Sequence, residues 1–251
     1  KLAAIDMPQD PPDRRRWLAP PLVDALADRL AKGEQSLLFL NRRGFAPLTL
    51  CRTCGHRIQC PNCTAWMVEH RLVHRLACHH CGHVMPPPRL CPECEDEDSL
   101  VACGPGVERV ADELSLRFPE ARTAIVTSDT LWSPAKAAEF VGAVEAGMVD
   151  IIIGTQLVTK GYHFPNLTLV GVVDADLGLD GGDLRASERT FQQIAQVAGR
   201  AGRGVKPGAV LIQTRVPDAP VMAALVANDR EGFYAAEAAA RRQAGAPPYG
   251  R

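Results

Sequence analysis

The chain has 251 residues, of which 46% are hydrophobic, and this length suits a main domain of ordinary size with a small insertion. The apolar content excludes a wholly disordered chain, and the sequence has neither an apolar run long enough to span a membrane nor a secretion signal. With 28 basic and 29 acidic residues, the net charge of −1 excludes binding to a polyanion through overall charge, so any nucleic acid must meet a local basic surface.

The first part of the chain predicts a helix followed by a buried strand. Pro20 and Pro21 stand where helices begin, apolar residues follow at helical spacing, and Gly33 ends the segment. Residues 36–40 are almost continuously apolar, which is typical of a strand buried on both faces.

Eight of the nine cysteines form four Cys-x-x-Cys pairs between residues 51 and 94. Two intervening residues let both thiolates of one turn bind the same metal ion, and the lack of a secretion signal favours zinc over disulfides. Eight thiolates make two closed sites of four ligands, which are structural because no position is left for water. The segment has few large apolar residues, so we expect zinc to supply much of its folding energy.

The spacing of the four pairs favours a nested arrangement. Fourteen residues separate Cys63 from Cys78, the length of a hairpin whose short strands fall near residues 66–68 and 72–73. One zinc site is then Cys60, Cys63, Cys78 and Cys81, and the other is Cys51, Cys54, Cys91 and Cys94. Sequential pairing is the main alternative. The nearby residues that we expect not to bind zinc are His56, His70, His74, His79, His80, His83 and, as a small buried residue, Cys103.

The rest of the chain, after about residue 103, alternates helix and strand. The predicted helices are 107–117, 133–146 and 187–198, and the predicted strands are 124–126, 150–153, 167–173 and 209–213. Strands buried on both faces with helices between them predict a parallel sheet in a three-layer α/β/α domain. In such a sheet the functional residues gather in loops after the carboxyl ends of the strands. The loops that we expect there are 41–45, 154–161 and 174–176.

Residues 196–203 read Gln-x-x-Gly-Arg-x-x-Arg, and we call them the arginine motif. Arg200 and Arg203 project to nearly one side of a helical turn, and the small residues around them let another domain approach. A guanidinium presented to a nucleotide held by another lobe stabilises charge on the transferring phosphoryl group. We therefore expect both guanidiniums at the edge of the sheet where the loops gather. The alternative is an exposed basic helix end, which suits the helix dipole.

Three stretches resemble a known family. Residues 152–156 with 160–165 resemble motif V of superfamily 2 helicases, and the arginine motif resembles motif VI. Residues 38–47, followed at once by the cysteine pairs, are similar to the PriA family of primosomal replication-restart helicases. The resemblance runs from about Asp6 to Pro248.

The resemblance implies the second RecA-like lobe of an ATP-dependent 3′-to-5′ DNA helicase with a two-zinc insertion. It implies that Arg200 and Arg203 reach ATP as arginine fingers and that Gln196 couples the nucleotide state to lobe closure. The residues that it places between nucleotide and DNA are Gly154, Thr155, Gln156, Lys160, Gly161 and Gly199. Arg42 and Arg43 contact DNA or form a solvated loop.

The resemblance also implies partners and a setting. The cofactors are ATP with Mg²⁺ and two structural zinc ions. The partners are forked and single-stranded DNA, primosome proteins and single-strand DNA-binding protein, with no membrane. We expect a monomer in the bacterial cytoplasm, associated with the nucleoid, that restarts stalled replication forks and assembles the primosome.

One departure from the family pattern concerns nucleotide binding. No Gly-Lys dipeptide occurs, so there is no Walker A loop, and no Asp-Glu-x-His box follows a strand. We expect a fragment that lacks the first motor lobe and is inactive alone. The predicted parts are the start of the lobe at 1–50, the zinc insertion at 51–103, the rest of the lobe at 104–240 and the start of a truncated C-terminal domain at 241–251.

Two other functions fit parts of the sequence. One is a non-enzymatic zinc-ribbon module that binds DNA or proteins on an inactive RecA-like scaffold. The other is a different superfamily 2 motor, such as a chromatin or repair translocase. The paired arginines argue against the first, and the four cysteine pairs argue against the second.

Overall fold

The computed structural model describes most of the chain as two compact units. The described residues are 1–14, 16–40, 48–51, 53–63, 66–70, 75–78, 80–97, 99–103, 107–126, 133–155, 164–176, 179, 185–202, 204 and 206–250. The unit that we call the sheet unit comprises Lys1–Arg42, Pro105–Gly178 and Ser187–Arg251. The cysteine unit comprises Arg43–Gly104 and Leu179–Ala186. None of the described helices has the length and apolar character needed to cross a membrane.

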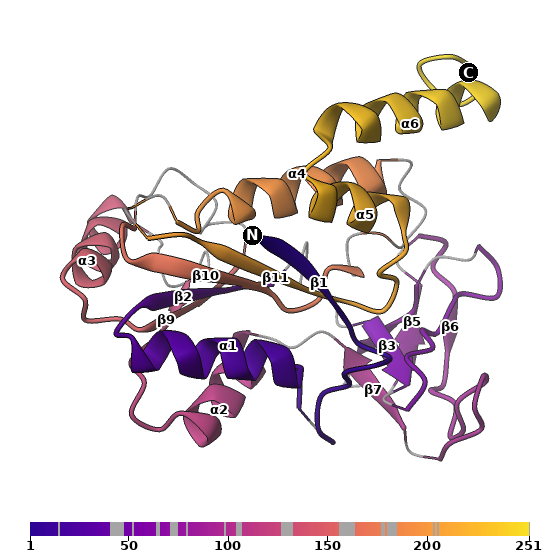
Figure 1. The fold of residues 1–251 in the computed structure, drawn as a ribbon. Helices are drawn as coiled ribbons and strands as arrows, with labels where there is room; N and C mark the ends of the chain where they lie inside the picture. The colour runs from indigo at the N-terminus through magenta and orange to yellow at the C-terminus, as the bar shows by residue number, and fades with distance from the viewer. Residues whose placement is uncertain are drawn as a thin grey trace. The chain divides into compact units, whose positions relative to one another are not determined.

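A six-stranded parallel sheet forms the centre of the sheet unit (Figure 1). Its order is β1-β11-β10-β2-β9-β8, and each neighbouring pair runs parallel. The strands are β1 (Leu2–Asp6), β2 (Gln35–Phe39), β8 (Thr123–Val126), β9 (Ile151–Gly154), β10 (Leu167–Val172) and β11 (Ala209–Thr214). Every residue of β2, β9 and β10 is buried, which confirms the prediction of a parallel sheet from apolar runs.

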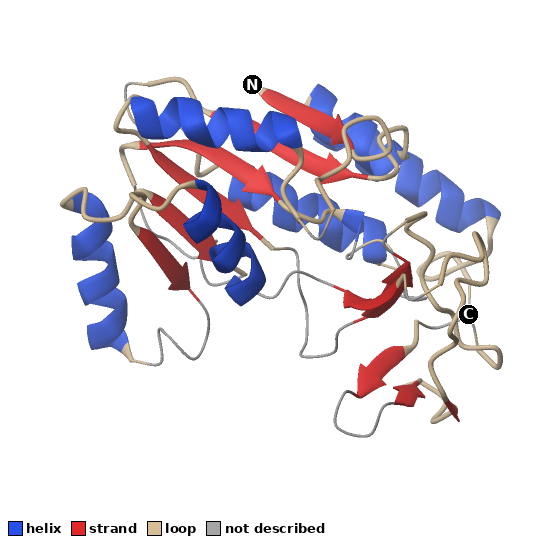
Figure 2. Ribbon diagram, turned by 90° about the horizontal axis from the view of Figure 1, so that it is seen from below, coloured by secondary structure: helices blue, strands red, loops and turns tan. Residues whose placement is uncertain are grey.

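Helices cover both faces of this sheet, so the predicted three-layer domain is confirmed. In Figures 1 and 2, α1 and α2 lie on one face, and Figure 1 shows α4 and α5 on the other. The helices are α1 (Pro20–Ala31), α2 (Val107–Arg117), α3 (Pro134–Glu145), α4 (Ala186–Ala198), α5 (Pro220–Ala227) and α6 (Arg230–Gln243). The core between α1, α2 and the sheet is built from aliphatic side chains such as Leu22, Leu26 and Ile153.

Local signals explain where the predicted helices begin and end. Ser133 caps α3, because its hydroxyl accepts a hydrogen bond from the Lys136 N–H at 3.3 Å, and Pro134 opens the first turn. Pro20 opens α1 in the same way. Gly33 follows α1 with a φ of +62°, a conformation that glycine adopts without a steric penalty.

Three elements of the sheet unit have no counterpart among the predictions. Strand β1 is an edge strand that pairs only with β11, more than 200 residues away, in the register Leu2↔Val210. Helix α5 is apolar throughout and gives no amphipathic period. Helix α6 packs on α4, where Phe233 stacks on Phe191 with ring centroids 4.4 Å apart and Arg241 pairs with Glu188 at 2.9 Å.

A buried carboxylate on α2 holds the segment that leads into α1. Glu113 is 2% exposed, and its Oε2 accepts the Trp17 N–H at 2.6 Å. Its Oε1 accepts the Arg117 Nε–H at 2.9 Å. Gln213 completes the anchoring, because its side-chain amide donates to the Trp17 carbonyl at 2.9 Å.

We expect Glu113→Ala to lower the free energy of unfolding of the sheet unit by about 3 kcal/mol, because it leaves the partly buried Trp17 N–H without its acceptor and removes the buried partner of the Arg117 guanidinium. Urea unfolding followed by circular dichroism measures this. Asp13→Ala is the control, since Asp13 also pairs with Arg117 but its side chain is 70% exposed; its cost should stay below about 1 kcal/mol. Equal costs for the two variants would contradict the role of burial.

The cysteine unit contains a five-stranded sheet of short strands. Its order is β6-β5-β4-β3-β7, and the pairs are antiparallel. The strands are β3 (Leu48–Cys51), β4 (Val68–His70), β5 (Arg75–Ala77), β6 (Val84–Met85) and β7 (Leu100–Cys103). The predicted hairpin between Cys63 and Cys78 is present as β4 and β5. Strand β4 begins two residues later than expected and β5 three residues later; residues 72–73 lie outside the described residues.

Candidate metal centres and arginine motif

The structure gathers the eight cysteines of the four pairs into two clusters of four. One cluster contains Cys51, Cys54, Cys91 and Cys94, and the other contains Cys60, Cys63, Cys78 and Cys81. Within each cluster all the sulfur atoms lie within 4.8 Å of one another. This is the nested arrangement and not the sequential one.

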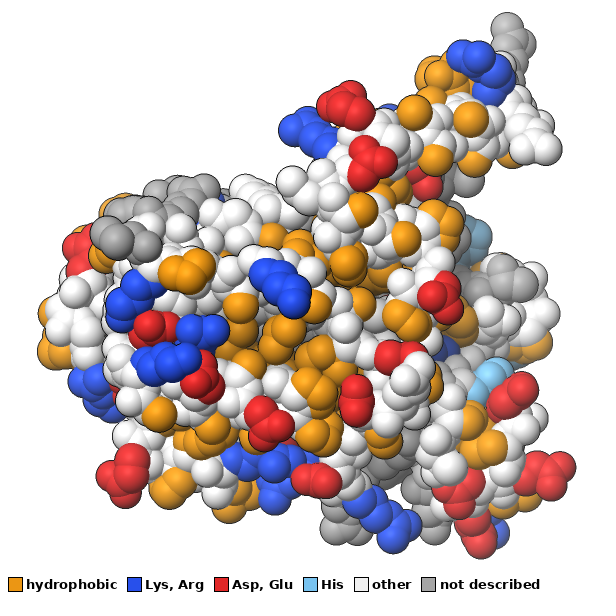
Figure 3. All heavy atoms as spheres, in the orientation of Figure 1, with side chains coloured by type: hydrophobic (Ala, Val, Ile, Leu, Met, Phe, Trp, Pro, Cys, Tyr) orange, Lys and Arg blue, Asp and Glu red, His pale blue; other side chains and the backbone are white. Residues whose placement is uncertain are grey.

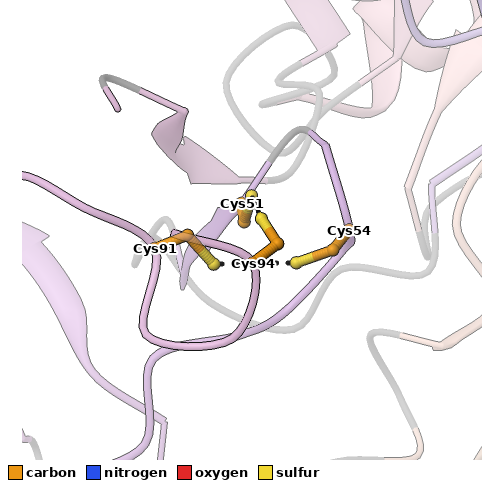
Figure 4. Close-up of side chains that lie close together, drawn as sticks. All are labelled: Cys51, Cys54, Cys91 and Cys94. Carbon is orange, nitrogen blue, oxygen red and sulfur yellow. Dashed lines mark hydrogen bonds between the residues drawn. The ribbon is translucent and has the colours of Figure 1, made fainter. Parts of the chain in front are cut away.

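The distances between the sulfur atoms fit a tetrahedral zinc site. Figure 4 shows the Sγ atoms of the first cluster pointing toward one another, with Cys51–Cys94 and Cys54–Cys91 both at 3.6 Å. In the second cluster Cys60–Cys81 is 3.5 Å and Cys63–Cys78 is 3.4 Å. Zinc–sulfur bonds of about 2.3 Å give a tetrahedral edge of about 3.8 Å, so a zinc ion fits each cluster with small adjustments.

In the described part of the chain, three of the Cys-x-x-Cys pairs share one backbone geometry. In each, the N–H four residues after the first cysteine donates to the carbonyl of that cysteine, at 2.9 Å for Gly55→Cys51, Gly82→Cys78 and Glu95→Cys91. The donor residue has a positive φ, of 79°, 77° and 57° respectively. Glycine adopts this conformation without strain after two of these pairs, whereas Glu95 has a steric penalty at the corresponding position of the third.

We expect Glu95→Gly to stabilise the zinc-loaded cysteine unit by about 0.5 kcal/mol, since relief of the left-handed backbone exceeds the added entropy of the unfolded chain. Gly55→Ala, the matched opposite change, should cost about 1 kcal/mol. Thermal unfolding of both variants at saturating zinc measures the two effects. A destabilised Glu95→Gly variant would show that the Glu95 side chain makes a contact worth more than the backbone penalty.

The electrostatics of the thiols favour a bound cation. Burial acts to raise the pKa of Cys51, but a hydrogen bond with the Ser99 side chain and hydrogen bonds from the backbone N–H groups of Cys54 and Thr53 lower it to about 6. Burial, together with the neighbouring thiols, raises the pKa of Cys54 to about 12. One thiolate therefore forms readily, and its negative charge disfavours ionisation of the next thiol. A divalent cation removes this repulsion between thiolates.

Two described histidines near these clusters, His56 and His83, take other partners. His83 Nδ1 lies 3.3 Å from the Asn62 amide nitrogen, and His56 Nδ1 lies 3.9 Å from a Glu93 carboxylate oxygen. Neither histidine belongs to a metal-binding cluster of the described residues. This agrees with the expectation that cysteines fill both sites.

The arginine motif lies at the opposite edge of the sheet from the one predicted. The Gly202 N–H donates to the carbonyl of Leu167, the first residue of β10, at 2.9 Å, so the end of the motif sits at the amino ends of the strands. The reason is topological: α4 starts after the carboxyl end of β10 and must return to the amino end of the parallel strand β11. The prediction of the carboxyl edge was therefore wrong.

The described members of the motif differ in exposure. Arg200 is 7% exposed, and its backbone N–H donates to the Val197 carbonyl at 2.9 Å. Gln196 and Gly199 are exposed at the end of α4. The predicted site residues outside the described residues are Arg42, Arg43, Gln156, Lys160, Gly161 and Arg203.

The other predicted loops that are described do follow the carboxyl ends of strands. Gly154 ends β9, and its carbonyl accepts the Leu40 N–H at 2.9 Å, while Thr155 comes next. Asp176 follows β10 and is 6% exposed. Its carboxylate accepts the Thr214 hydroxyl at 2.5 Å and the Arg215 N–H at 2.7 Å, so it ties the ends of β10 and β11 together.

The sequence reasoning missed Glu34 and Lys206, which lie near the end of the arginine motif. Pro165 ends the stretch that resembles motif V, and its carbonyl lies so close to Gly204 that a side chain at Gly204 would collide with it. Glu34 and Lys206 form an ion pair of 3.1 Å at the same edge. A charged residue directly before a buried strand, as Glu34 is, was the available signal.

Positive charge is not concentrated on the face of the molecule shown in Figure 3, where Lys and Arg side chains alternate with Asp and Glu. This agrees with the net charge of −1. Any contact with a polyanion on that face must therefore be local.

Comparisons with known proteins point to one family. A family model described as the Cys-rich region of the PriA DNA helicase matches residues 60–86. The replication restart protein PriA of Rickettsia conorii is 47% identical over 247 residues, which cover 98% of this chain and 38% of that protein. PriA of Bacillus subtilis is 44% identical over 228 residues, or 91% of this chain and 28% of that protein. The chain thus spans less than two fifths of the length of these relatives.

Among solved structures, domain 2 of the DEAD-box helicase Mss116p bound to an RNA duplex aligns with 89% of this chain and 57% of that chain. The TM-score is 0.43 and the sequence identity is 10%. The fold assignment therefore rests on the parallel sheet itself and on the close relatives.

Proposed function

Because this chain belongs to the PriA family of replication restart proteins, we propose that it forms the second motor lobe of an ATP-dependent DNA helicase that restarts stalled replication forks. The observation that carries the proposal is identity of 47% over 98% of the chain with a PriA protein, together with two four-cysteine clusters inside the matched region. The lobe has the parallel sheet with helices on both faces that such a motor requires.

In this proposal the arginine motif supplies positive charge to ATP and Mg²⁺ held mainly by a first lobe. Since the motif lies at the amino edge of the sheet, the nucleotide must approach that edge. Pro165, the last residue of the stretch that resembles motif V, lies against Gly204, which directly follows the arginine motif, at the same edge. The burial of Arg200 favours Arg203 as the finger that touches the phosphate, with Arg200 supporting the turn.

The two zinc ions are structural in the proposal, because each cluster offers four thiolates and no open position. The zinc-bound unit contacts the fork or docks primosome proteins and single-strand DNA-binding protein. Movement is 3′ to 5′ on single-stranded DNA, and Gly154, Thr155 and the residues after them contact the backbone of that strand. The protein acts as a monomer in the bacterial cytoplasm, associated with the nucleoid.

The decisive experiment compares ATP hydrolysis on forked DNA by the full-length protein and by residues 1–251 alone. We expect DNA-stimulated turnover and unwinding of forked DNA by the full-length protein. We expect essentially no turnover by the 251-residue chain, because it contains no Walker A loop. Substrates with a single 3′ or 5′ tail then decide the direction of movement.

The rival function, a non-enzymatic zinc-ribbon module on an inactive scaffold, makes the opposite prediction for the full-length protein. It expects DNA binding without ATP turnover on any fork. Absence of hydrolysis by a zinc-loaded, folded full-length protein would therefore replace the motor proposal with this one.

A further inference from the structure

A buried carboxylate at the amino edge of the sheet joins separate segments of the chain. Glu34 is 8% exposed and stands directly before β2. Its Oε2 accepts the Thr168 hydroxyl of β10 at 2.6 Å and an Arg29 N–H of α1 at 3.0 Å. Its Oε1 lies 3.1 Å from the Lys206 ammonium. The carboxylate thus connects α1, β2 and β10 to the stretch between the arginine motif and β11.

Lys206 makes a second contact at this edge. Its ammonium donates to the Asn166 side-chain carbonyl at 3.4 Å, and the Asn166 amide donates to the Gly33 carbonyl at 2.9 Å. The Lys206 side chain is 49% exposed, so its ion pair with Glu34 forms at the surface of a buried network. Lys206 thus links the stretch after the arginine motif to this network.

The loop of residues 202–208 needs an anchor because its backbone is rich in glycine. Gly202 has a φ of +71°. A Cβ atom at Gly202 would collide with the backbone of Gly208, and a Cβ atom at Gly204 would collide with the Pro165 carbonyl. These glycines permit the close crossing of the chain, but glycine leaves the backbone many alternative conformations. Contacts made by side chains must therefore select one of them.

The charge of Glu34 persists at neutral pH. The hydrogen bond from Thr168, together with those from Lys206 and Arg29, outweighs the effect of burial and lowers the Glu34 pKa to about 2. A charge-assisted hydrogen bond to such a carboxylate is about twice as strong as a neutral one. The network is thus able to hold Lys206 firmly.

On the basis of the proposed motor function, we infer that Glu34 and Lys206 are positioning residues that fix the loop of residues 202–208 and, with it, the arginine motif relative to bound nucleotide. Neither side chain needs to touch ATP. Their effect passes through the backbone from Lys206 to Gly202, which bonds to the start of β10. A shift of about 1 Å in a catalytic group can lower a rate by about a hundredfold, so the anchoring of this loop affects turnover more than stability.

The test measures kcat and KM for ATP on forked DNA in the full-length, zinc-loaded protein. We expect Lys206→Met to lower kcat about tenfold with little change in KM, because the transition state is affected more than ground-state binding. Lys206→Arg should recover most of the loss, since it restores a cation that can reach Glu34 and Asn166. The double variant Glu34→Gln/Lys206→Met should be no slower than Lys206→Met alone, because both changes remove one coupled interaction.

Lys32→Met is the matched control. Lys32 is an equally exposed lysine near the same edge that pairs with Asp28 at 2.7 Å, and this variant should retain the wild-type kcat. Retention of kcat by Lys206→Met overturns the inference, and so does a loss of kcat that parallels a loss of folded protein in thermal unfolding. If the wild-type protein hydrolyses no ATP, the proposed function fails and the positioning role fails with it. If wild type is active and Lys206→Met is equally active, only the positioning role fails.

Discussion

Arg203→Ala is expected to lower DNA-stimulated ATP turnover of the full-length protein by about a thousandfold, the effect measured when an arginine finger is removed from other phosphoryl-transfer enzymes. A guanidinium neutralises charge that develops on the transferring phosphoryl group, and alanine leaves that charge to water. Steady-state hydrolysis on forked DNA at saturating ATP measures the change. DNA affinity, measured by fluorescence anisotropy, should stay within about twofold, because the loss concerns the transition state.

Two further variants serve as a control and a comparison for Arg203→Ala. Arg189→Ala, on α4 and outside the arginine motif, should retain turnover. Arg200→Ala should lower both turnover and thermal stability, because Arg200 is 7% exposed and its removal leaves a gap beside the end of α4. Equal turnover for Arg203→Ala and wild type would eliminate the finger role. A loss confined to Arg200→Ala would transfer that role to Arg200.

Removal of zinc is expected to unfold the cysteine unit and to leave the six-stranded sheet folded. Among the described residues of this unit, the buried cluster contains Ile58, Met67 and Leu76 besides two cysteines. So small a core cannot stabilise the unit alone, whereas structural zinc contributes on the order of 10 kcal/mol per site. Hydrogen exchange before and after chelation should show loss of protection in 48–103 and retained protection in β2, β9 and β10.

Metal content provides the matched comparison. The wild-type chain should hold about two zinc ions, as eight thiolates in two clusters require. Cys60→Ser should hold about one. Cys103→Ser is the control, because four cysteines of the Cys-x-x-Cys pairs already complete each cluster, and it should still hold about two. Persistent protection of 48–103 in zinc-free protein would contradict the role of the metal, and a loss of protection in β9 as well would show that the two units fold together.

Some features of this protein were predictable because they depend on local spacing. The apolar runs at 36–40 and 150–153 predicted strands buried on both faces, and β2 and β9 lie at those places. Ser133 followed by Pro134 predicted the start of α3. The fourteen residues between Cys63 and Cys78 predicted the nested clusters, because a hairpin of that length brings its two ends together.

Other features were not predictable because they depend on pairing between distant segments. Strand β1 is short and partly exposed, and only its register with β11 makes it a strand. The arginine motif lies at the amino edge because α4 runs back from the carboxyl end of β10 to the amino end of β11. The sequence interpretation did not take this return direction into account.

The sequence by itself determined the class of fold, the two sets of metal ligands and the family, since each of these depends on residues close together or on motifs of fixed length. Only the tertiary structure decided which edge of the sheet presents Arg200 and Gly202 and that Glu34 meets Lys206 across 171 intervening positions. The physical reason is that a periodic pattern specifies which face of an element is buried, whereas the partner of a single charged side chain is specified only when the elements have packed.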